Sequence, residues 1–597
     1  MALNFLNGDD EFERAHAMHI AGRLMDAGPL YQAVLRTNPN HRWALHNLAA
    51  IAVQTGQPQA GIELLRHLLK LDPHNADAFN TLGEAYRGIG MPTEALQCFD
   101  KAIEFNPTFR PAYNNRGIVQ ATLGRSTDAM ESWKKAIAVA GDSADSRKWQ
   151  AVVHNNLGNA CLERGEIGEA MEHHRRACEF DPNNPIYHSN LLRGLVHADD
   201  VPADTLRAAH VDWWHRHVAG ITPMQQPPGG DAEKKLRIGM LSPDFREHSV
   251  AYFLTNLFKH YNRERFEFLC YSNSQISDAM TQQIAAKATR FRDIVTFTDE
   301  RLVTLIRQDQ IDVLVDLAGH TANHRLRVLA YKPAPVQVTY LGYPQTTGGR
   351  LVDWRITDPI ADPPGMTDPH FVERLWRLPR CAWCYQSPVE IAAEETPPTL
   401  RGETLTFASF NNYSKVTDRM ISLWGRILGA VPASRLLLKA VALRDENICE
   451  QARSRFASAG VHADRLVFSG KRNTMAEHLA LYREVDLALD TFPYDGTTTT
   501  CEALWMNVPV ITLEGATHAS RVGVSLLSAV GLPELIAKNE DEYAAIAQRL
   551  ATASNELMRI RTGLRRRLQQ SPLMDGPGFA RDFCEALRGM WREYVTR

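Results

Sequence analysis

A repeat of 34 residues in the first third of the chain constrains the fold more than any other feature of the sequence. Equivalent repeats begin at Arg42, Ala76 and Arg110. In the second of them, small and large apolar residues and a final proline recur at Phe79, Leu82, Gly83, Tyr86, Ala95, Phe99, Ala102 and Pro107. Small residues let two helices approach closely, large side chains fill the gap, and proline ends the second helix. Each repeat is therefore predicted to be a helical hairpin.

The period and the residue order are those of a tetratricopeptide repeat. After an insertion at Gly141–Gln150, the pattern resumes with Leu157 and Gly158. We expect about four clear repeats, a degenerate one before them (Arg14–His41) and a partial one after them (Pro185–Val196). Because each hairpin leaves an apolar face that only its neighbour can cover, residues 1–200 are predicted to stack into an α-superhelix with a concave, protein-binding groove.

Asparagines recur within this array. Asn47, Asn115 and Asn156 occupy the same repeat position, and Thr81 breaks the series. These amides either bridge neighbouring helices or line the groove and hold a peptide backbone, since an amide can donate and accept at once. Both interpretations stay open at this stage.

Bulk properties exclude several classes of protein. A chain of 597 residues is too long for one core, so three or more packed units are expected. The formal net charge of -3 gives no general attraction to nucleic acid or membranes. The acidic start lacks the features of a secretory signal, and no apolar run is long enough to span a bilayer. The nine cysteines are scattered; Cys381 and Cys384 form a C-x-x-C without a second pair, so we expect neither zinc nor disulfides, and a cytoplasmic location.

The remaining two-thirds of the chain alternate between strand-like and helix-like segments. A connecting helix and a linker rich in proline, glycine and charge (Met224–Lys235) are predicted for residues 201–235. Strand-like runs follow in two series, LRIGML, FEFLCYS, IDVLVDLA and VQVTYLGY, then LTFASF, SRLLLKA, RLVFSG, VDLALD and PVITLEG. This alternation predicts two Rossmann-like α/β lobes, residues 236–390 and 400–597, joined near Ser387–Thr399 with a ligand cleft between them. Neither a dinucleotide fingerprint nor a Walker-type loop is present.

The string LDTFPYDGTTTTCEALWMNVPVIT, from Leu489 to Thr512, is the most informative motif. A strand ends at Asp490, a turn follows, and four threonines open a helix. Backbone N–H groups and hydroxyls at a helix N-terminus form an anion site that suits a diphosphate. Glu502 lies one turn beyond Thr498, where it could accept hydrogen bonds from a ribose. The alternative is a threonine cap without a ligand, although four hydroxyls exceed what one cap requires.

This string, together with LSPDFREHSVAYFL, DLAGHTANHRL, KPAPVQVTYLGYPQTTG and FASFNNYSKV, resembles the O-GlcNAc transferase and SPINDLY family. The similarity covers essentially the whole chain and keeps the motifs in order. It implies a GT-B type fold, a nucleotide-sugar donor, inversion at the anomeric carbon, and serine or threonine hydroxyls of proteins as acceptors. The large domain that interrupts the catalytic region of animal enzymes is absent, because the interlobe segment is short.

The resemblance also implies roles for two catalytic residues. His248 matches the family histidine that points at the sugar and has been proposed as the general base; an imidazole titrates near operating pH and can accept a proton. Lys415 matches the family lysine that contacts the diphosphate, where a fixed ammonium would stabilise the leaving nucleotide. This lysine would replace a divalent cation, so no metal or other cofactor is expected beyond the donor UDP-GlcNAc.

Further residues are expected by resemblance to bind the donor. His478 matches a histidine beside the nucleoside, and Thr321 and the turn Leu341–Gly342–Tyr343–Pro344 match residues that line the sugar pocket. Glycine in that turn would let the backbone approach the donor. The predicted substrate-binding set is Thr321, Leu341, Gly342, Pro344, Asn412, His478, Gly496, Thr497, Thr498, Thr499 and Glu502.

Several positions depart from the animal enzymes and leave the donor open. Asn412 stands where those enzymes carry glutamine, Thr497 where they carry histidine, Glu502 where they carry aspartate, and Ala318 where they carry asparagine. The nucleotide-binding loop is more similar to the SPINDLY branch, which is associated with GDP-fucose. The leading hypothesis is protein O-glycosylation with UDP-GlcNAc; the alternatives are O-fucosylation with GDP-fucose and a repeat scaffold whose sugar-nucleotide module only binds.

Overall fold

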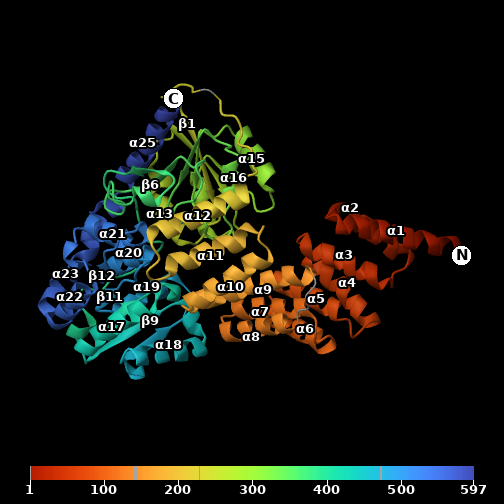
Figure 1. Ribbon diagram of the computed structural model, residues 1–597, viewed down its shortest axis with the longest axis horizontal. Coiled ribbons are helices and arrows are strands. Elements are labelled where there is room, and N and C mark those ends of the chain that lie inside the picture. Colours follow the sequence, from red (N-terminus) through yellow and green to blue (C-terminus); the bar gives the residue numbers. More distant parts are fainter. Residues whose placement is uncertain (1, 140–143, 228, 471–473, 597) are drawn as a thin grey trace. The chain divides into compact units, whose positions relative to one another are not determined.

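The computed structural model describes residues 2–139, 144–227, 229–470 and 474–596. The chain divides into two compact units, Met1–Ala160 with Glu179–Asp181, and Cys161–Cys178 with Pro182–Arg597. The first unit is built from helical hairpins, and the second contains two parallel sheets with the helices that cover them (Figure 1).

The first unit is a series of antiparallel helix pairs. Its helices are α1 (Ala2–Ile20), α2 (Leu24–Thr37), α3 (Arg42–Gln54), α4 (Pro58–Leu71), α5 (Ala76–Gly88), α6 (Pro92–Phe105), α7 (Arg110–Thr122), α8 (Ser126–Ala138) and the larger part of α9 (Ala144–Glu163). Helices α3, α5 and α7 begin at the three residues from which the 34-residue period was counted. The repeat prediction is therefore confirmed, whereas part of the predicted insertion at Gly141–Gln150 lies outside the described residues.

Small and large residues meet inside each hairpin as the repeat pattern requires. A Cβ atom on Gly83 would lie 2.6 Å from Cε1 of Phe99, and one on Gly117 would lie 2.5 Å from Nε1 of Trp133. Both aromatic side chains are buried. A side chain at either glycine would therefore push the two helices of its hairpin apart.

The asparagines of the array bond to neighbouring helices. The Asn115 amide donates to Asn80 Oδ1 at 3.0 Å and to Glu84 Oε1 at 2.8 Å on the preceding repeat. Asn156 donates to Asn114 at 2.9 Å. In the structure these amides therefore hold adjacent repeats together, which favours the bridging interpretation.

Three further helices lead into the sheets, namely α10 (Ile167–Phe180), α11 (Pro185–His197) and α12 (Ala203–Val218). By compactness, α11 and α12 belong to the second unit. Their side chains bond to loops of the first lobe: Ser189 Oγ lies 3.1 Å from His320 Nδ1 and 2.9 Å from His324 Nε2, and His210 Nε2 lies 2.9 Å from the Tyr343 hydroxyl. These contacts explain why the last helices pack with the sheets.

The first lobe, called the N-lobe below, contains a seven-stranded parallel sheet of order β3-β2-β1-β4-β5-β6-β7. Its strands are β1 (Leu236–Ser242), β2 (Phe266–Ser272), β3 (Arg290–Asp293), β4 (Val313–Asp316), β5 (Val336–Thr339), β6 (Trp354–Thr357) and β7 (Arg374–Arg377). Helices α13 (Ser249–His260), α14 (Ala279–Lys287), α15 (Asp299–Gln308) and α16 (Leu326–Ala330) connect them, with the short 3-10 helix η1 (Asp368–His370) before β7. Strand β1 pairs with β2 and β4, with Ile238 opposite Phe268 and Val313.

The C-lobe contains a six-stranded parallel sheet of order β10-β9-β8-β11-β12-β13. Its strands are β8 (Leu405–Ser409), β9 (Ser434–Lys439), β10 (Leu466–Ser469), β11 (Leu487–Leu489), β12 (Val510–Leu513) and β13 (Ile536–Ala537). The helices are α17 (Asp418–Ala430), α18 (Glu446–Ser458), α19 (Met475–Ala480), α20 (Thr498–Trp505), α21 (Val522–Val530), α22 (Glu540–Thr552), α23 (Ser554–Arg561), α24 (Leu564–Gln569) and α25 (Gly576–Val595). The 3-10 turns are η2 (Pro398–Arg401), η3 (Tyr413–Lys415), η4 (Val441–Arg444), η5 (Ala463–Arg465), η6 (Leu481–Glu484), η7 (His518–Ser520), η8 (Pro533–Leu535) and η9 (Pro572–Met574). The two-lobe α/β prediction is confirmed.

The last helix, α25, was grouped with the C-lobe by sequence but packs against α13 of the N-lobe. Arg588 Nη1 donates to the carbonyl of Ala232 at 2.7 Å, and Trp591 Nε1 donates to the carbonyl of Asp231 at 3.1 Å. Phe583 also contacts Tyr340 of the N-lobe, with ring centroids 5.2 Å apart. The end of the chain thus fixes the linker residues that precede β1.

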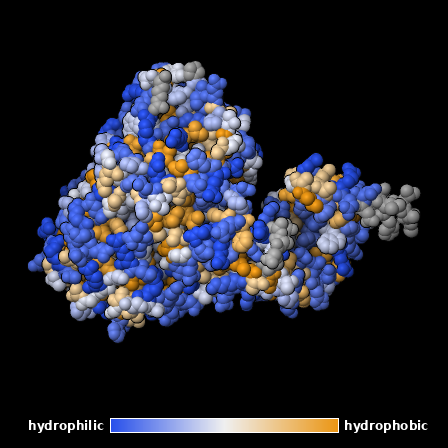
Figure 2. Space-filling model, viewed as in Figure 1, coloured by the Kyte–Doolittle hydropathy of each residue, from blue (hydrophilic) through white to orange (hydrophobic). Residues whose placement is uncertain are grey.

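One apolar core cluster of the second unit runs through both lobes, and a second one lies between the N-lobe sheet and helices α11, α12 and α15. The face seen in Figure 2 is mostly hydrophilic. Within the described residues, no helix is both long enough and apolar enough to cross a membrane. The nine cysteines are free thiols, and burial raises the pKa of Cys384, one of the C-x-x-C pair, to about 12.

Candidate active-site cleft

A cavity of about 380 Å³ lies in the second unit where strands of both sheets end. The loops that follow β1, β4 and β5 line it from the N-lobe, and the loops that follow β8 and β11 line it from the C-lobe. Its lining residues are Arg193, Val196, His197, His248, Ser249, Val250, Phe253, Thr321, Leu341, Gly342, Tyr343, Phe410, Asn411, Asn412, Lys415, Tyr494, Thr497, Thr498 and Thr499. Ligands of parallel α/β sheets bind at this edge.

The threonine cluster forms the start of α20, as the sequence predicts. Thr497 is the N-cap residue, and Thr497, Thr498 and Thr499 all line the cavity. The approach to the helix is fixed by Asp490, whose Oδ1 accepts the Gly496 N–H at 2.7 Å. Because the first N–H groups of a helix have no intrahelical acceptor, this terminus presents positive potential to the cavity.

Two hydroxyls of the cluster, those of Thr499 and Thr500, form hydrogen bonds within the protein. Thr499 Oγ1 donates to Asn411 Oδ1 at 3.0 Å, and Thr500 Oγ1 donates to the Gly496 carbonyl at 3.1 Å. Gly496 itself does not line the cavity, but a Cβ there would lie 2.5 Å from Thr499 Oγ1. Gly496 thus lets the loop turn tightly into the helix.

Lys415 ends the turn η3 and is half-buried in the cavity wall. Its Nζ donates to the Asp495 carbonyl at 2.6 Å and lies 3.8 Å from the centroid of the Tyr494 ring. Burial lowers the pKa of Lys415 to about 8, although the nearby carboxylates of Asp490 and Asp495 oppose the shift. The ammonium is therefore held in one place, and a bound anion would favour its charged form.

His248 is the N-cap residue of α13, and its side chain is about one-third exposed (37%). Nδ1 accepts the Val250 N–H at 3.3 Å, and it lies 3.6 Å from Asp244 Oδ1. Burial lowers the His248 pKa, and Arg246 adds to this effect, while Asp244 opposes it. The ring is therefore neutral near pH 7. With Nδ1 accepting a hydrogen bond, the ring proton lies on Nε2, which then donates rather than accepts.

His478 and Glu502 pair with each other. His478 Nε2 lies 2.8 Å from Glu502 Oε2, both side chains are buried, and neither residue lines the cavity. The His478 ring lies beside Phe410, which does line the cavity, with centroids 5.9 Å apart. The structure thus brings together two residues that were expected, separately, to bind the nucleoside.

The N-lobe residues of the expected sugar pocket are divided. Thr321, Leu341 and Gly342 line the cavity, whereas Pro344 is buried and does not. Glycine at position 342 also has an internal reason, because a Cβ there would lie 1.9 Å from the carbonyl oxygen of Leu317. This glycine lets two loops of the protein pass each other.

Sequence reasoning missed the contribution of α11. Arg193 and His197 line the cavity together with Tyr343 and Tyr494. His197 Nδ1 lies 2.8 Å from the Arg193 carbonyl, and burial lowers the His197 pKa to about 4. In sequence, α11 resembles one more repeat helix, and only its packing in the second unit gives it this position.

Comparisons with known proteins show which family has this architecture. The family model described as "Glycosyl transferase family 41" matches residues 215–385 and 391–583, and tetratricopeptide-repeat models match residues 44–75, 76–109 and 158–198. The chain is 38% identical over 71% of its length to the protein of Oryza sativa named "Probable UDP-N-acetylglucosamine--peptide N-acetylglucosaminyltransferase SPINDLY", and it covers 46% of that protein. It is 30% identical over 63% of its length to the Arabidopsis thaliana protein named SEC, covering 40% of it.

The chain thus spans about half the length, or less, of these curated relatives. Among solved structures, a mutant of the O-GlcNAc transferase of Thermobaculum terrenum is 33% identical, with a TM-score of 0.80 over 87% of this chain and 98% of that one. The repeats and the two parallel-sheet lobes are thus found together in one family. The chain belongs to glycosyl transferase family 41.

Proposed function

We propose that this chain is an inverting protein O-glycosyltransferase that moves N-acetylglucosamine from UDP-GlcNAc to serine or threonine hydroxyls. The observation that carries the proposal is the juxtaposition of the α20 N-terminus, with Thr497 and Thr498, and the half-buried Lys415 in one cavity. Helix N–H groups and a fixed ammonium match the charge of a nucleotide diphosphate. The relatives whose names include this activity support the donor and the acceptor class.

In this mechanism Lys415 stabilises the negative charge that grows on the departing UDP. A preorganised donor acts more strongly on the transition state than on the bound donor sugar, because the charge is greater there. We propose that Lys415 and the helix terminus take the place of a divalent cation, so that transfer proceeds in the presence of a chelator.

His248 has a positioning role in this proposal. Because Nδ1 accepts the Val250 N–H, the neutral ring offers an Nε2–H donor to a sugar oxygen or to the acceptor hydroxyl. Acting as general base would require the ring to turn or to adopt the other tautomer, in which Nδ1–H donates to Asp244 and Nε2 can accept a proton. Asp244 lies 3.6 Å away, within reach of a small adjustment.

We further propose that the repeat array presents protein acceptors to the cleft. Tetratricopeptide arrays bury hydrophobic faces between repeats and leave a concave surface for extended segments of a partner. The amides that bridge the repeats keep that surface rigid. The cytoplasmic location stays a prediction from the sequence.

The alternative donor is GDP-fucose. It rests on the association of the SPINDLY branch with GDP-fucose, whereas the SPINDLY relative, at 38% identity, is named for UDP-GlcNAc. The residues Asn412, Thr497, Glu502 and Ala318, at which the chain departs from animal enzymes, point in the same direction. The alternative from outside the enzymes is a module that binds a nucleotide sugar without transferring it.

Calorimetric titration of the full chain with UDP, UDP-GlcNAc and GDP-fucose tests the donor. We expect saturable binding of UDP and UDP-GlcNAc, and their loss in Lys415→Met. Binding of GDP-fucose with no heat from UDP would replace the proposal by its fucose alternative. Tight UDP-GlcNAc binding without transfer to any protein would favour the binding module.

A further inference from the structure

Two aspartates lie beside Lys415 on the loop between β11 and α20. Asp490 is 2% exposed and Asp495 is fully buried. Both lie close enough to the Lys415 ammonium for a charge on either one to favour its protonated form. A buried charge is costly unless hydrogen bonds or an opposite charge stabilise it. The partners of each carboxyl group therefore decide which of the two aspartates is charged.

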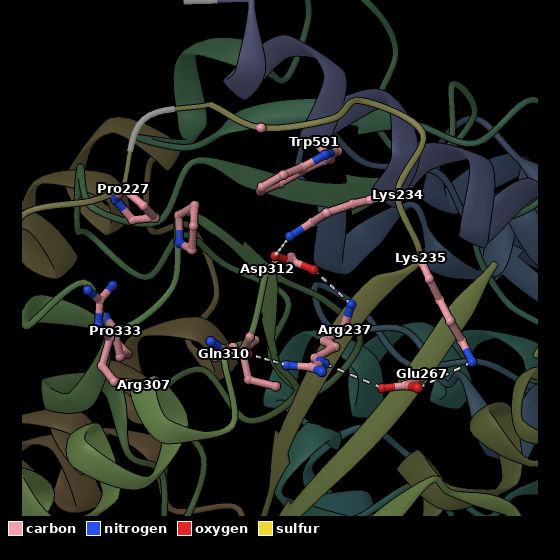
Figure 3. Close-up of a pocket in the computed structure, with 13 residues that line it drawn as sticks. Pro227, Lys234, Lys235, Arg237, Glu267, Arg307, Gln310, Asp312, Pro333 and Trp591 are labelled. Atoms are coloured by element: carbon pink, nitrogen blue, oxygen red, sulfur yellow. Dashed lines mark hydrogen bonds and ion pairs between the residues drawn. The ribbon is translucent and has the colours of Figure 1, made fainter.

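The contact between Lys415 and these aspartates differs from an ordinary ion pair. In the cavity of about 600 Å³ at the amino ends of the N-lobe strands, Asp312 Oδ1 accepts directly from Lys234 Nζ at 2.6 Å (Figure 3). Lys415 Nζ instead donates to a backbone carbonyl, that of Asp495. Its attraction to the two side chains acts over a longer distance, through a largely buried part of the lobe where charges are poorly screened.

Asp490 accepts four hydrogen bonds, all from neutral donors. Its Oδ1 accepts the N–H groups of Gly496 and Thr491, at 2.7 and 2.9 Å, and the Asn411 amide at 3.2 Å. Its Oδ2 accepts the Thr512 hydroxyl at 2.9 Å. Burial raises the pKa of Asp490, and these hydrogen bonds oppose the rise. Donors aimed at a carboxylate stabilise its charged form, so Asp490 is surrounded as a buried anion would be.

Asp495 has fewer partners for its side chain. Oδ2 accepts the Gly523 N–H of α21 at 2.9 Å, whereas Oδ1 is buried and has no hydrogen-bond partner among the residues that the structure describes. Burial raises the pKa of Asp495 well above its usual range, and the charge of Asp490 adds to this effect. An unpaired neutral oxygen costs much less in a buried site than an unpaired charge. These surroundings favour the protonated form.

The hydrogen bonds of Asp490 also connect the segments that line the cleft. Gly496 leads into α20, and Asn411 belongs to the loop after β8 that ends in Lys415. Asn411 Oδ1 in turn accepts the Thr499 hydroxyl at 3.0 Å, and both of these residues line the cleft. One carboxylate thus joins the loop that carries Lys415 to the start of α20.

We propose that Asp490 is a positioning residue, whose carboxylate keeps Lys415 protonated and ties its loop to the start of α20, whereas Asp495 is protonated and neutral. Asp490 does not line the cleft, so it acts through Lys415 and the helix terminus and not on the donor itself. The inference deepens the proposed function and rests on it, because it concerns the diphosphate site of the same cleft.

The other ionisable groups around this site do not titrate between pH 7 and pH 9. Those that line the cleft with Lys415 are His197, Arg193, His248, Tyr343 and Tyr494, and those near the two aspartates are Arg521 and Tyr543. Burial lowers the pKa of both histidines, and it raises the pKa of all three tyrosines. The arginines stay charged. The pH dependence of UDP binding in this range therefore reports on Lys415 and the charge beside it.

Calorimetric titration with UDP from pH 6 to pH 9 tests the inference in the full chain, with Asp490→Asn and Asp495→Asn as a matched pair. In the unmodified chain, affinity should fall with a midpoint near pH 8, the pKa of Lys415. In Asp490→Asn the midpoint should move by about one pH unit or more towards acid, since a nearby opposite charge has an effect of this size. Asp495→Asn replaces one neutral group by another and keeps an oxygen for the Gly523 N–H, so its midpoint should stay near pH 8.

The positioning role is measured at pH 6, where Lys415 is charged in the unmodified chain. There Asp490→Asn should still bind UDP about threefold to tenfold more weakly, because the loops have lost hydrogen bonds that hold them together. Titration of UDP itself is common to all three proteins and cancels in the comparison.

An unchanged midpoint in Asp490→Asn would overturn the inference, and so would an acid shift in Asp495→Asn as large as that in Asp490→Asn. Asp495→Asn decides the assignment even if Asp490→Asn does not fold, because a charged Asp495 requires an acid shift and a neutral one requires none. Failure of UDP to bind the unmodified chain would overturn both this inference and the proposed function. A chain that shows the expected shifts but transfers no sugar would contradict only the proposed function, whereas transfer without a shift in Asp490→Asn would contradict only the inference.

Discussion

Lys415 should make the affinity for UDP depend on pH in the alkaline range. Its pKa is lowered to about 8 in the unliganded protein, because the side chain is half-buried. A diphosphate beside the ammonium favours the charged form, so the pKa rises again on binding. The nucleotide therefore binds the protonated lysine, and alkaline pH removes that form.

The size of the effect follows from the titration. With a pKa near 8, about nine-tenths of the lysines are charged at pH 7 and about one-tenth at pH 9. Affinity for UDP should thus fall about tenfold between these pH values, which corresponds to about 1.4 kcal/mol. The complex should also take up about half a proton at pH 8. Among the cleft residues that the structure describes, His197, with a pKa of about 4, and Tyr494, with a pKa of about 12, titrate well outside this range.

The assay is calorimetric titration with UDP from pH 7 to pH 9, in buffers of different ionisation enthalpy. Lys415→Arg is the matched control, because arginine keeps its charge at every pH tested. Any titration of UDP itself affects both proteins equally. An affinity that changes by the same factor in the two proteins, with no proton uptake specific to Lys415, would refute the placement of the diphosphate beside this lysine.

Further predictions concern catalysis, acid stability and the repeat array. Lys415→Ala should lower the single-turnover rate by about two to three decades. His248→Ala should cost less and keep the pH profile; a larger His248 defect that removes an ionisation would restore it as the general base. Burial lowers the pKa of His210 and of His324 to about 4, so each should cost about 1.4 kcal/mol of unfolding free energy per pH unit as pH falls from about 6.5 towards 4. Urea unfolding should show this slope, and His210→Gln should reduce it; an unchanged slope would contradict the burial argument. A chain that begins at Ala144 should bind UDP like the full chain but lose transfer to folded proteins, whereas retained transfer would contradict the role of the array.

The fold was predictable where the pattern of apolar residues is strong. The 34-residue period gave the starts of α3, α5 and α7, and short apolar runs gave strands such as β1 and β8. Strand β3 has the sequence RFRD and β7 has the sequence RLWR, so charged residues hide these strands from any hydrophobic pattern. The position of α25 depends on tertiary packing against α13, which leaves no local signal.

The candidate site, too, was predictable from the sequence only in part. Lys415, His248 and Thr497–Thr499 lie in ordered motifs, and the structure brings them to one cavity. Arg193 and His197 reach that cavity from a helix that looks like an ordinary repeat, so their position could not be predicted from sequence. His478 and Glu502 were each expected to contact the donor, but pairing between two distant segments is invisible until the lobe is folded.

The proposed transfer is tested most directly by an assay with the full chain, a pool of proteins as acceptors and a chelator of divalent cations. UDP-GlcNAc and GDP-fucose are supplied separately, and the acceptors are analysed by mass spectrometry. We expect N-acetylhexosamine on serine and threonine from UDP-GlcNAc, none with the Lys415→Met variant, and no modification from GDP-fucose. Deoxyhexose from GDP-fucose, or no modification from either donor by a chain that binds UDP, would contradict it.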